Sequence, residues 1–225
     1  MIRWEQAGYV VAFTTRNGGV SDGVYASLNL TSGTGDDPAR VDENRRIACA
    51  ALGLDAARLS YNRQVHSPNV HRAGRRGEPG DGLWSDAPGE PMAAFAADCL
   101  PIAIARTEGE RALTVLHAGW RGLADGVIEA GASALGDGPK AAVVGPAIGP
   151  CCYEVGEEVS SLFDDDLTVD RRLDLWAAAA RALRRAGVEH VEGVGLCTRC
   201  HPSLFFSHRR DGRARGTQGV IGALA

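Results

Sequence analysis

The chain has 225 residues, 44% of them apolar and 23% charged, so it is long enough to bury a full core as one large domain or two small ones. Its net charge of -4 offers no basic face of the kind that binds nucleic acid, so we expect no nucleic-acid partner. No apolar run approaches the ~20 residues of a membrane span, and no secretory signal opens the sequence. We therefore expect a cytoplasmic protein without membrane contact. Its six cysteines should then be reduced.

The first half of the chain predicts two strands, one helix and two loops. In order, they are a β-rich strand at 9–15, a Gly-rich loop at 16–23, a helix at 37–52, a strand at 59–65 that ends at His66, and a polar loop at 71–91. The helix has clear limits, because Asp37-Pro38 opens it with proline at an early position and Gly53 lies just past its end.

The second half of the chain predicts the remaining strands and helices. In order, they are short apolar runs at 92–97 and 102–105 that flank Cys99, a strand at 112–116 that leads to His117, a helix at 123–135, a buried strand at 140–144, a Gly- and Pro-rich loop at 145–153, helices at 155–163 and 173–186, and strands at 191–196 and 203–207. Strands and helices alternate without the regular phasing of a doubly wound fold. We therefore predict an α+β layered sandwich.

Three residues have the side-chain types of a metal site: His66, Cys99 and His117. Two imidazoles and one thiolate suit tetrahedral zinc, and three protein ligands with an open fourth position are typical of a catalytic zinc. Two of the three end a predicted strand, where a rigid scaffold presents functional residues. From residue types alone, they could instead be two ordinary loop histidines and a small buried cysteine. A Cys99 nucleophile with His66 or His117 as its base is a further alternative.

The segment 117–122 also predicts an anion site. After His117, free backbone N–H groups and Arg121 stand at the start of a helix, and two glycines allow a ligand to approach the backbone closely. The alternative is a plain strand–turn–helix connection in which Trp120 anchors the core. Loop residues that could add anion contacts, or simply be solvated, are Arg16, Asn17, Arg209 and Arg210.

A second cysteine pattern, Cys-x-x-Cys-His at 197–201, matches the attachment motif of c-type haem. Haem of this type is attached outside the cytosol, so we set that interpretation aside. A zinc knuckle would need a second pair of ligands at suitable spacing, and only His208 lies nearby in the sequence. We interpret the motif as a chance pattern in a loop, and the adjacent Cys151 and Cys152 as packing residues.

Eight segments, in order along nearly the whole chain, resemble the YfiH family of purine nucleoside phosphorylases, also called the laccase-domain or polyphenol-oxidase family. The most specific are 117–122, which reads HAGWRG, and 145–156, which reads GPAIGPCCYEVG. The others are at 15–21, 27–30, 43–46, 64–66, 97–101 and 205–211. Two departures bear on substrate preference: His208 stands where the family usually has Tyr, and the tail at 213–218 differs from the usual Thr-Gly-Arg segment.

The resemblance implies a single domain over residues 1–225 with an α/β/β/α layered fold and mixed sheets. It also implies a cytoplasmic zinc enzyme whose metal ligands are His66, Cys99 and His117. The implied substrates are purine nucleosides and inorganic phosphate, with phosphorolysis of adenosine, inosine, guanosine and methylthioadenosine and deamination of adenosine. We expect a monomer or a small homo-oligomer.

Further site residues are hypotheses from the same segments. Deamination at a zinc centre needs a proton shuttle, and Asp98 is our candidate beside the three ligands. Candidate contacts to the substrate or to phosphate are Arg16, Asn17, Asn44, Arg121 and Arg209.

Copper is the less favoured metal. A trinuclear copper cluster with a type 1 copper needs many more histidines than the six present, largely in His-x-His pairs, and the sequence has no such pair. A single His₂Cys copper with Met92 as axial ligand would transfer electrons, which leaves a copper-dependent polyphenol oxidase as an alternative. A cytoplasmic hydrolase that edits peptidoglycan precursors with a Cys/His site is another. The open three-ligand set argues against a non-enzymatic interaction module.

Overall fold

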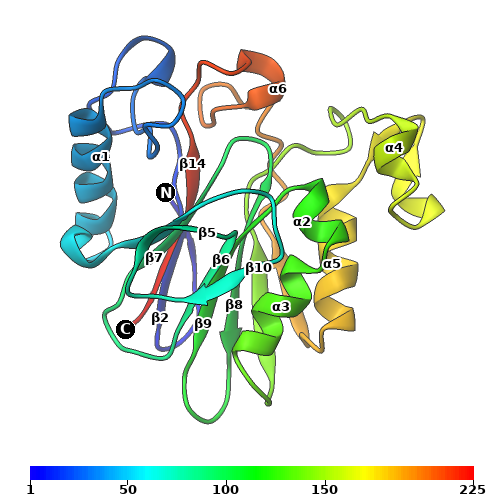
Figure 1. The fold of residues 1–225 in the computed structure, drawn as a ribbon, viewed down its shortest axis with the longest axis horizontal. Coiled ribbons are helices and arrows are strands. Elements are labelled where there is room, and N and C mark those ends of the chain that lie inside the picture. Colours follow the sequence, from blue (N-terminus) through cyan, green and yellow to red (C-terminus); the bar gives the residue numbers. More distant parts are fainter.

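Short apolar runs separated by turns build two six-stranded sheets in a computed structural model that describes residues 1–225 (Figure 1). The first sheet contains, in spatial order, β1 (Ile2–Trp4), β2 (Tyr9–Phe13), β14 (Gln218–Leu224), β7 (Met92–Ala96), β3 (Ser60–Arg63) and β5 (Arg76–Pro79). The second contains β13 (His190–Gly193), β10 (Lys140–Val144), β8 (Leu100–Arg106), β9 (Leu113–Ala118), β6 (Gly82–Ser85) and β4 (Val70–Arg72). A separate two-stranded ribbon pairs β11 (Thr168–Val169) with β12 (Arg172–Leu173).

Both sheets are mixed. In the first, β3 runs parallel to β5 and β7, whereas β1, β2, β14 and β7 pair antiparallel. In the second, β10 is parallel to β13 and β4 to β6, and the remaining pairs are antiparallel. The α+β class with mixed sheets is therefore confirmed.

Alternate residues of the central strands enter different layers of the molecule, as the two-residue period of a strand requires. In β8, Ile102 and Ile104 face the helices, whereas Ala103 and Ala105 face the other sheet. Small side chains on the inner face let the sheets approach. The inner layer contains residues of both sheets, such as Phe13 of β2.

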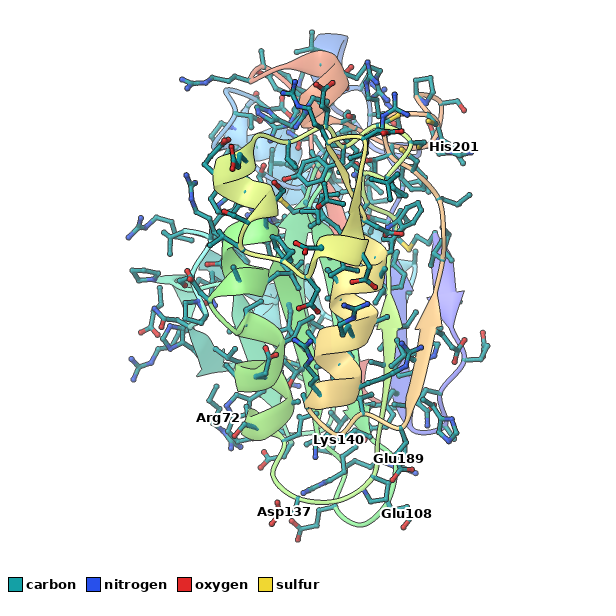
Figure 2. The ribbon with its side chains drawn as sticks, turned by 90° about the vertical axis from the view of Figure 1, so that its right-hand side faces the viewer. Arg72, Glu108, Asp137, Lys140, Glu189 and His201 are labelled. Carbon is teal, nitrogen blue, oxygen red and sulfur yellow. The ribbon has the colours of Figure 1, made fainter.

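The main helices cover the outer faces of the two sheets. They are α1 (Pro38–Ala50), α2 (Trp120–Ala124), α3 (Val127–Ala134) and α5 (Leu175–Arg185); two short helices are α4 (Glu157–Ser160) and α6 (His208–Asp211). On the first sheet, Cys49 of α1 packs in a cluster with Ala93 and Phe95 of β7. On the second sheet, α3 and α5 lie side by side in Figure 2 and share a large apolar cluster with β8 and β9. This order of layers, helix, sheet, sheet and helix, is the predicted α/β/β/α sandwich. None of the helices has the length and hydropathy needed to cross a bilayer.

The structure differs from the predicted elements in several places. The segment 71–91 is not a loop but carries β4, β5 and β6, and the helix expected at 123–135 is two helices with a break at Gly126, whose φ is 87°. The helix expected at 155–163 is reduced to the four residues of α4, and 203–207 is not a strand. Four strands, β1, β11, β12 and β14, were not expected.

Local chemistry explains these differences. The β5 segment, Arg-Gly-Glu-Pro, has no apolar alternation, so only its backbone pairing marks it as a strand. The consecutive Phe205 and Phe206 are both fully buried, which a two-sided strand pattern does not predict, and the Phe206 N–H donates to the Gln218 side chain instead of a strand neighbour.

Candidate active site

The three predicted metal ligands come together where the chain passes from one sheet to the other. His66 lies between β3 and β4, Cys99 lies between β7 and β8, and each of these connections joins the first sheet to the second. His117 is the next-to-last residue of β9, opposite Pro101 of β8. The ligand atoms of the three side chains all lie within 4.8 Å of one another.

The geometry of the three side chains fits a tetrahedral metal ion. The Cys99 Sγ is 3.9 Å from the His66 Nε2, and zinc with ordinary bond lengths holds a sulfur and a nitrogen ligand about 3.6 Å apart. The rings of His66 and His117 are 4.9 Å apart and nearly perpendicular, at 82°. The donor set can therefore hold one divalent ion and leave a fourth position for a substrate.

A glycine makes this close approach possible. A Cβ atom at Gly119 would lie 2.8 Å from the His66 Cδ2 and 3.1 Å from the Cys99 Sγ. Any larger residue would push the two ligands out of position. The first glycine of the HAGWRG segment is thus explained by crowding at the metal centre.

Asp81, a fully buried residue just before β6, connects the two histidines. Its Oδ1 is 2.8 Å from the His117 Nδ1, so the Nε2 of that ring is left to face the other ligands. Its Oδ2 accepts the N–H groups of Val65 and Ser67, at 3.1 and 2.7 Å. His66 lies between these two residues, so the bonds fix the backbone on both sides of it and hold it at its unusual φ of 60°. Carboxylates that orient a ligand histidine in this way are typical of metal sites.

Sequence reasoning missed Asp81 because it lies in a segment assigned to a polar loop. The sequence could only suggest that some carboxylate pairs with a ligand histidine, since such pairs are common at metal sites. The sequence offers many carboxylates, and only the pairing of β6 with β9 selects this one.

The site favours a thiolate beside a protonated imidazole when no metal is bound. Burial alone would raise the pKa of Cys99, but the charge and hydrogen bond of His117 and the hydrogen bond of His66 lower it to about 6. Burial alone would lower the pKa of His117, but Cys99 and Asp81 raise it to about 9. Burial would also raise the pKa of Asp81, but the hydrogen bonds from His117 and Ser67 lower it to about 2. The thiolate that a metal requires is therefore present at neutral pH.

A cavity of about 350 Å³ opens against the three ligands, a volume suited to a small organic molecule. Its other walls carry two aromatic rings, three arginines and several polar side chains. They are Tyr61, Phe95, Arg45, Arg63, Arg215, Asn62, Gln64, Thr31, Ser32 and Thr217, together with Gly33, Ala96 and Ala97. No aspartate or glutamate lines the cavity.

Arg215 is a cavity residue that sequence reasoning did not select, since it lies in the tail that departs from the family pattern. Its Nη1 donates to the carbonyls of Gly212 and Arg213, but its Nε is buried and has no partner. Burial lowers the pKa of this guanidinium. Because Arg215 lines the cavity, an anion bound there would lie beside this cationic side chain.

Three predicted contacts in the N-terminal half lie outside the cavity lining and hold loops. The Arg16 guanidinium donates to two backbone carbonyls and stacks on Phe206 at 4.5 Å, and the Asn17 amide donates to the Ser203 carbonyl. Asn44 is completely buried, and its amide bonds only to protein groups. The assignment of Asn44 to a substrate contact is therefore corrected, because no ligand can reach it.

The other predicted residues also have neighbours within the protein. Asp98 accepts hydrogen bonds from the Thr198 and Ser207 hydroxyls and the Arg209 N–H, so its carboxylate is fully engaged and does not line the cavity. These bonds connect the residue before Cys99 to the segments around Thr198 and Ser207. The Arg209 side chain donates to the Glu154 carbonyl. Arg121 is exposed, stacks on Trp120 at 4.5 Å and lies outside the cavity lining.

Comparisons with known proteins match almost the entire chain. A family model described as "Multi-copper polyphenol oxidoreductase laccase" matches residues 10–224. The purine nucleoside phosphorylase YfiH of Escherichia coli is 37% identical over 93% of this chain and 92% of its own. The purine nucleoside phosphorylase PA4543 of Pseudomonas aeruginosa is 40% identical over 89% of this chain and 87% of its own. The crystal structure of Neisseria meningitidis protein NMB0706 superposes with a TM-score of 0.88 and 36% identity, covering 97% of this chain and 95% of that one.

Proposed function

Because the chain belongs to the multi-copper polyphenol oxidoreductase laccase family, in which its relatives carry the name purine nucleoside phosphorylase, we propose that it is a zinc-dependent purine nucleoside phosphorylase. The observation that carries this proposal is one cavity that combines the His66, Cys99 and His117 centre with aromatic and arginine side chains. We propose further that residues 1–225 form a single catalytic domain and that it works in the cytoplasm.

Zinc is the metal that we propose for this centre. Two imidazoles and one thiolate suit zinc with an open fourth position, and when bound, zinc supplies Lewis-acid polarisation of a substrate oxygen. A type 1 copper would need a weak axial ligand such as methionine. Met92, the candidate in the sequence, begins β7, whereas Cys99 lies beyond the other end of that strand, so extended chain at about 3.3 Å per residue holds Met92 away from the centre. The copper alternative therefore has no support at this site.

Phosphate binding is proposed for Arg215 with Arg63. Both line the cavity, no aspartate or glutamate shares that lining, and Arg63 is exposed. Arginine holds phosphate oxygens through directed, charge-assisted hydrogen bonds. This pair replaces Arg121 and Arg16, which point to other partners, as the phosphate contact. The two arginines would hold phosphate for attack on the C1′ of the ribose and offset its charge.

The nucleoside is proposed to pack against Tyr61 and Phe95, whose rings are 5.8 Å apart in the cavity wall. Asn62 donates its Nδ2 to the Gly82 carbonyl, so its Oδ1 is left to accept a hydrogen bond from a base. The proposed substrates are adenosine, inosine, guanosine and methylthioadenosine.

Adenosine deamination is proposed as a slower reaction of the same centre. Zinc deaminases use a glutamate to move protons, whereas no carboxylate lines this cavity. We therefore expect phosphate-dependent cleavage to exceed deamination.

The test is a comparison of zinc-loaded wild type with two arginine variants on adenosine and phosphate. We expect Arg215→Ala to raise the KM for phosphate about tenfold or more, the loss expected for a charged hydrogen bond. The exposed Arg213→Ala, two residues away in the same loop, serves as the control and should leave that KM unchanged. Equal effects of the two substitutions would remove Arg215 from the phosphate site. No phosphate-dependent release of base from any of the four nucleosides would contradict the proposed function.

A further inference from the structure

Four cysteines from two loops gather in a second cluster that the proposed function does not use. Cys151 and Cys152 follow β10, and Cys197 and Cys200 follow β13. The four sulfurs all lie within 4.8 Å of one another. The motif at 197–201 and the adjacent pair Cys151 and Cys152, which the sequence did not connect, therefore each bring two thiols to one place.

The sulfur–sulfur separations match those of a single tetrahedral ion. The Cys200 Sγ lies 3.7 Å from the Cys151 Sγ and 3.4 Å from the Cys152 Sγ. Four thiolates around one zinc, with ordinary Zn–S bonds, are about 3.8 Å apart. An iron–sulfur cluster places several irons and inorganic sulfides between its thiolates and needs more space than this.

Backbone contacts fix the two loops against each other at this point. Ala147 and Cys197 form an isolated bridge, and the Thr198 N–H donates to the Ala147 carbonyl at 3.0 Å. The Gly149 N–H donates to the Cys197 Sγ at 3.3 Å, a contact that stabilises a thiolate. The sulfurs are thus presented by a preformed frame and not by two mobile loops.

Charge near the cluster also suits a metal thiolate centre. Four thiolates with one divalent ion carry a net negative charge. Arg199 lies within the Cys197–Cys200 motif, and the Arg210 guanidinium donates to the carbonyls of Thr198 and Arg199. Figure 2 shows the next residue after the cluster, His201, at the end of the molecule opposite Glu108 and Asp137. The His201 Nδ1 is 2.9 Å from the Cys197 carbonyl.

We propose that Cys151, Cys152, Cys197 and Cys200 bind one zinc ion as a structural site, separate from the His66, Cys99 and His117 centre. Protein ligands fill all four positions, which distinguishes a structural zinc from a catalytic one. The ion ties the loop after β10 to the loop after β13. From that second loop, the Thr198 hydroxyl donates to Asp98, the neighbour of Cys99, at 2.6 Å. The structural zinc therefore supports the backbone that presents the catalytic cysteine.

Metal content of the purified full-length protein tests the proposal first. We expect two zinc ions per chain in the wild type, one in Cys151→Ser/Cys200→Ser and one in His66→Ala/His117→Ala. Cys49→Ala is the control, because Cys49 is a buried residue of α1 and belongs to neither cluster, and this variant should keep two zinc ions. One zinc per chain in the wild type, lost entirely in His66→Ala/His117→Ala, would overturn the proposal.

A spectroscopic measurement keeps the test valid if the double cysteine variant does not fold. In His66→Ala/His117→Ala protein reconstituted with Co²⁺, we expect strong thiolate-to-cobalt charge transfer and the visible bands of a tetrahedral ion. The absence of these bands, or four freely reactive thiols in zinc-saturated wild type, would contradict the assignment. Iron in place of zinc would overturn the choice of metal.

Discussion

At the scale of single residues, one buried carboxylate controls the proposed catalytic centre. Asp81 bonds to the His117 ring and to the backbone on both sides of His66. The same carboxylate raises the pKa of His117. The types of the three ligands could be recognised in the sequence, but Asp81 and Arg215 could not. They are ordinary polar residues of segments that resemble loops, and only the folded chain brings them to the site.

Removing the charge of Asp81 should weaken metal binding. Asp81→Asn keeps the size of the side chain but loses the carboxylate that orients His117, and loss of such a partner typically costs about 10- to 100-fold in metal affinity. Competition with a zinc chelator measures this affinity. Asp86→Asn is the matched control, since Asp86 pairs with Arg72 on the surface. Equal affinities of Asp81→Asn and wild type would show that the carboxylate does not act on the metal.

The reactivity of Cys99 in metal-free protein should depend on pH through its lowered pKa. The thiolate is present above about pH 6 and is lost as the pH falls through that value. Alkylation by iodoacetamide, followed at the Cys99 peptide by mass spectrometry, should therefore reach half its maximal rate near pH 6. In His117→Asn the midpoint should rise toward the ordinary value of 9.0, because His117 contributes most to the lowering. A midpoint near 9.0 in the wild type would refute the thiolate–imidazolium pair.

At the scale of helices and strands, prediction succeeded where local signals agree with the fold. The strand at 140–144 is found with its predicted limits, and α1 starts at Pro38 with Asp37 accepting the Ala39 N–H. The strands in 71–91 could not be predicted, because pairing with distant partners, and not local composition, makes them strands. How closely two strands approach also depends on which strands pair, and the local sequence does not show it. Gly219 of β14, which lies against Ala94 and Phe95 of β7, is an example.

Gly219→Ala should destabilise the fold. A Cβ at this position would lie 2.1 Å from the Ala94 carbonyl oxygen and 2.9 Å from the Phe95 Cα, and these backbone atoms cannot move without disturbing β7. Overpacking of this kind costs about 1–3 kcal/mol of unfolding free energy. Urea denaturation measures the change. Gly193→Ala in β13 is the matched control: a Cβ there would have no atom within 4 Å, so the substitution should be neutral or stabilising by about 0.4–1 kcal/mol. Similar losses for both would contradict the crowding at Gly219.

At the scale of the whole molecule, the stacked sheets create the site. His66 and Cys99 lie on two of the three connections that carry the chain from the first sheet to the second, and His117 lies near the end of a strand of the second. A layered fold could be predicted from the order of elements, but the position of the cavity depends on which strands are neighbours. The two cysteine pairs are near in space for the same reason, because β10 and β13 are parallel neighbours.

Phosphorus NMR of zinc-loaded protein with inosine and inorganic phosphate tests the central claim most directly. The claim predicts that ribose 1-phosphate appears at the same rate as free hypoxanthine is released, and that both stop in Cys99→Ala. Release of hypoxanthine without a ribose phosphate signal would contradict the claim. So would the absence of any reaction of inosine when the metal centre of the protein is filled.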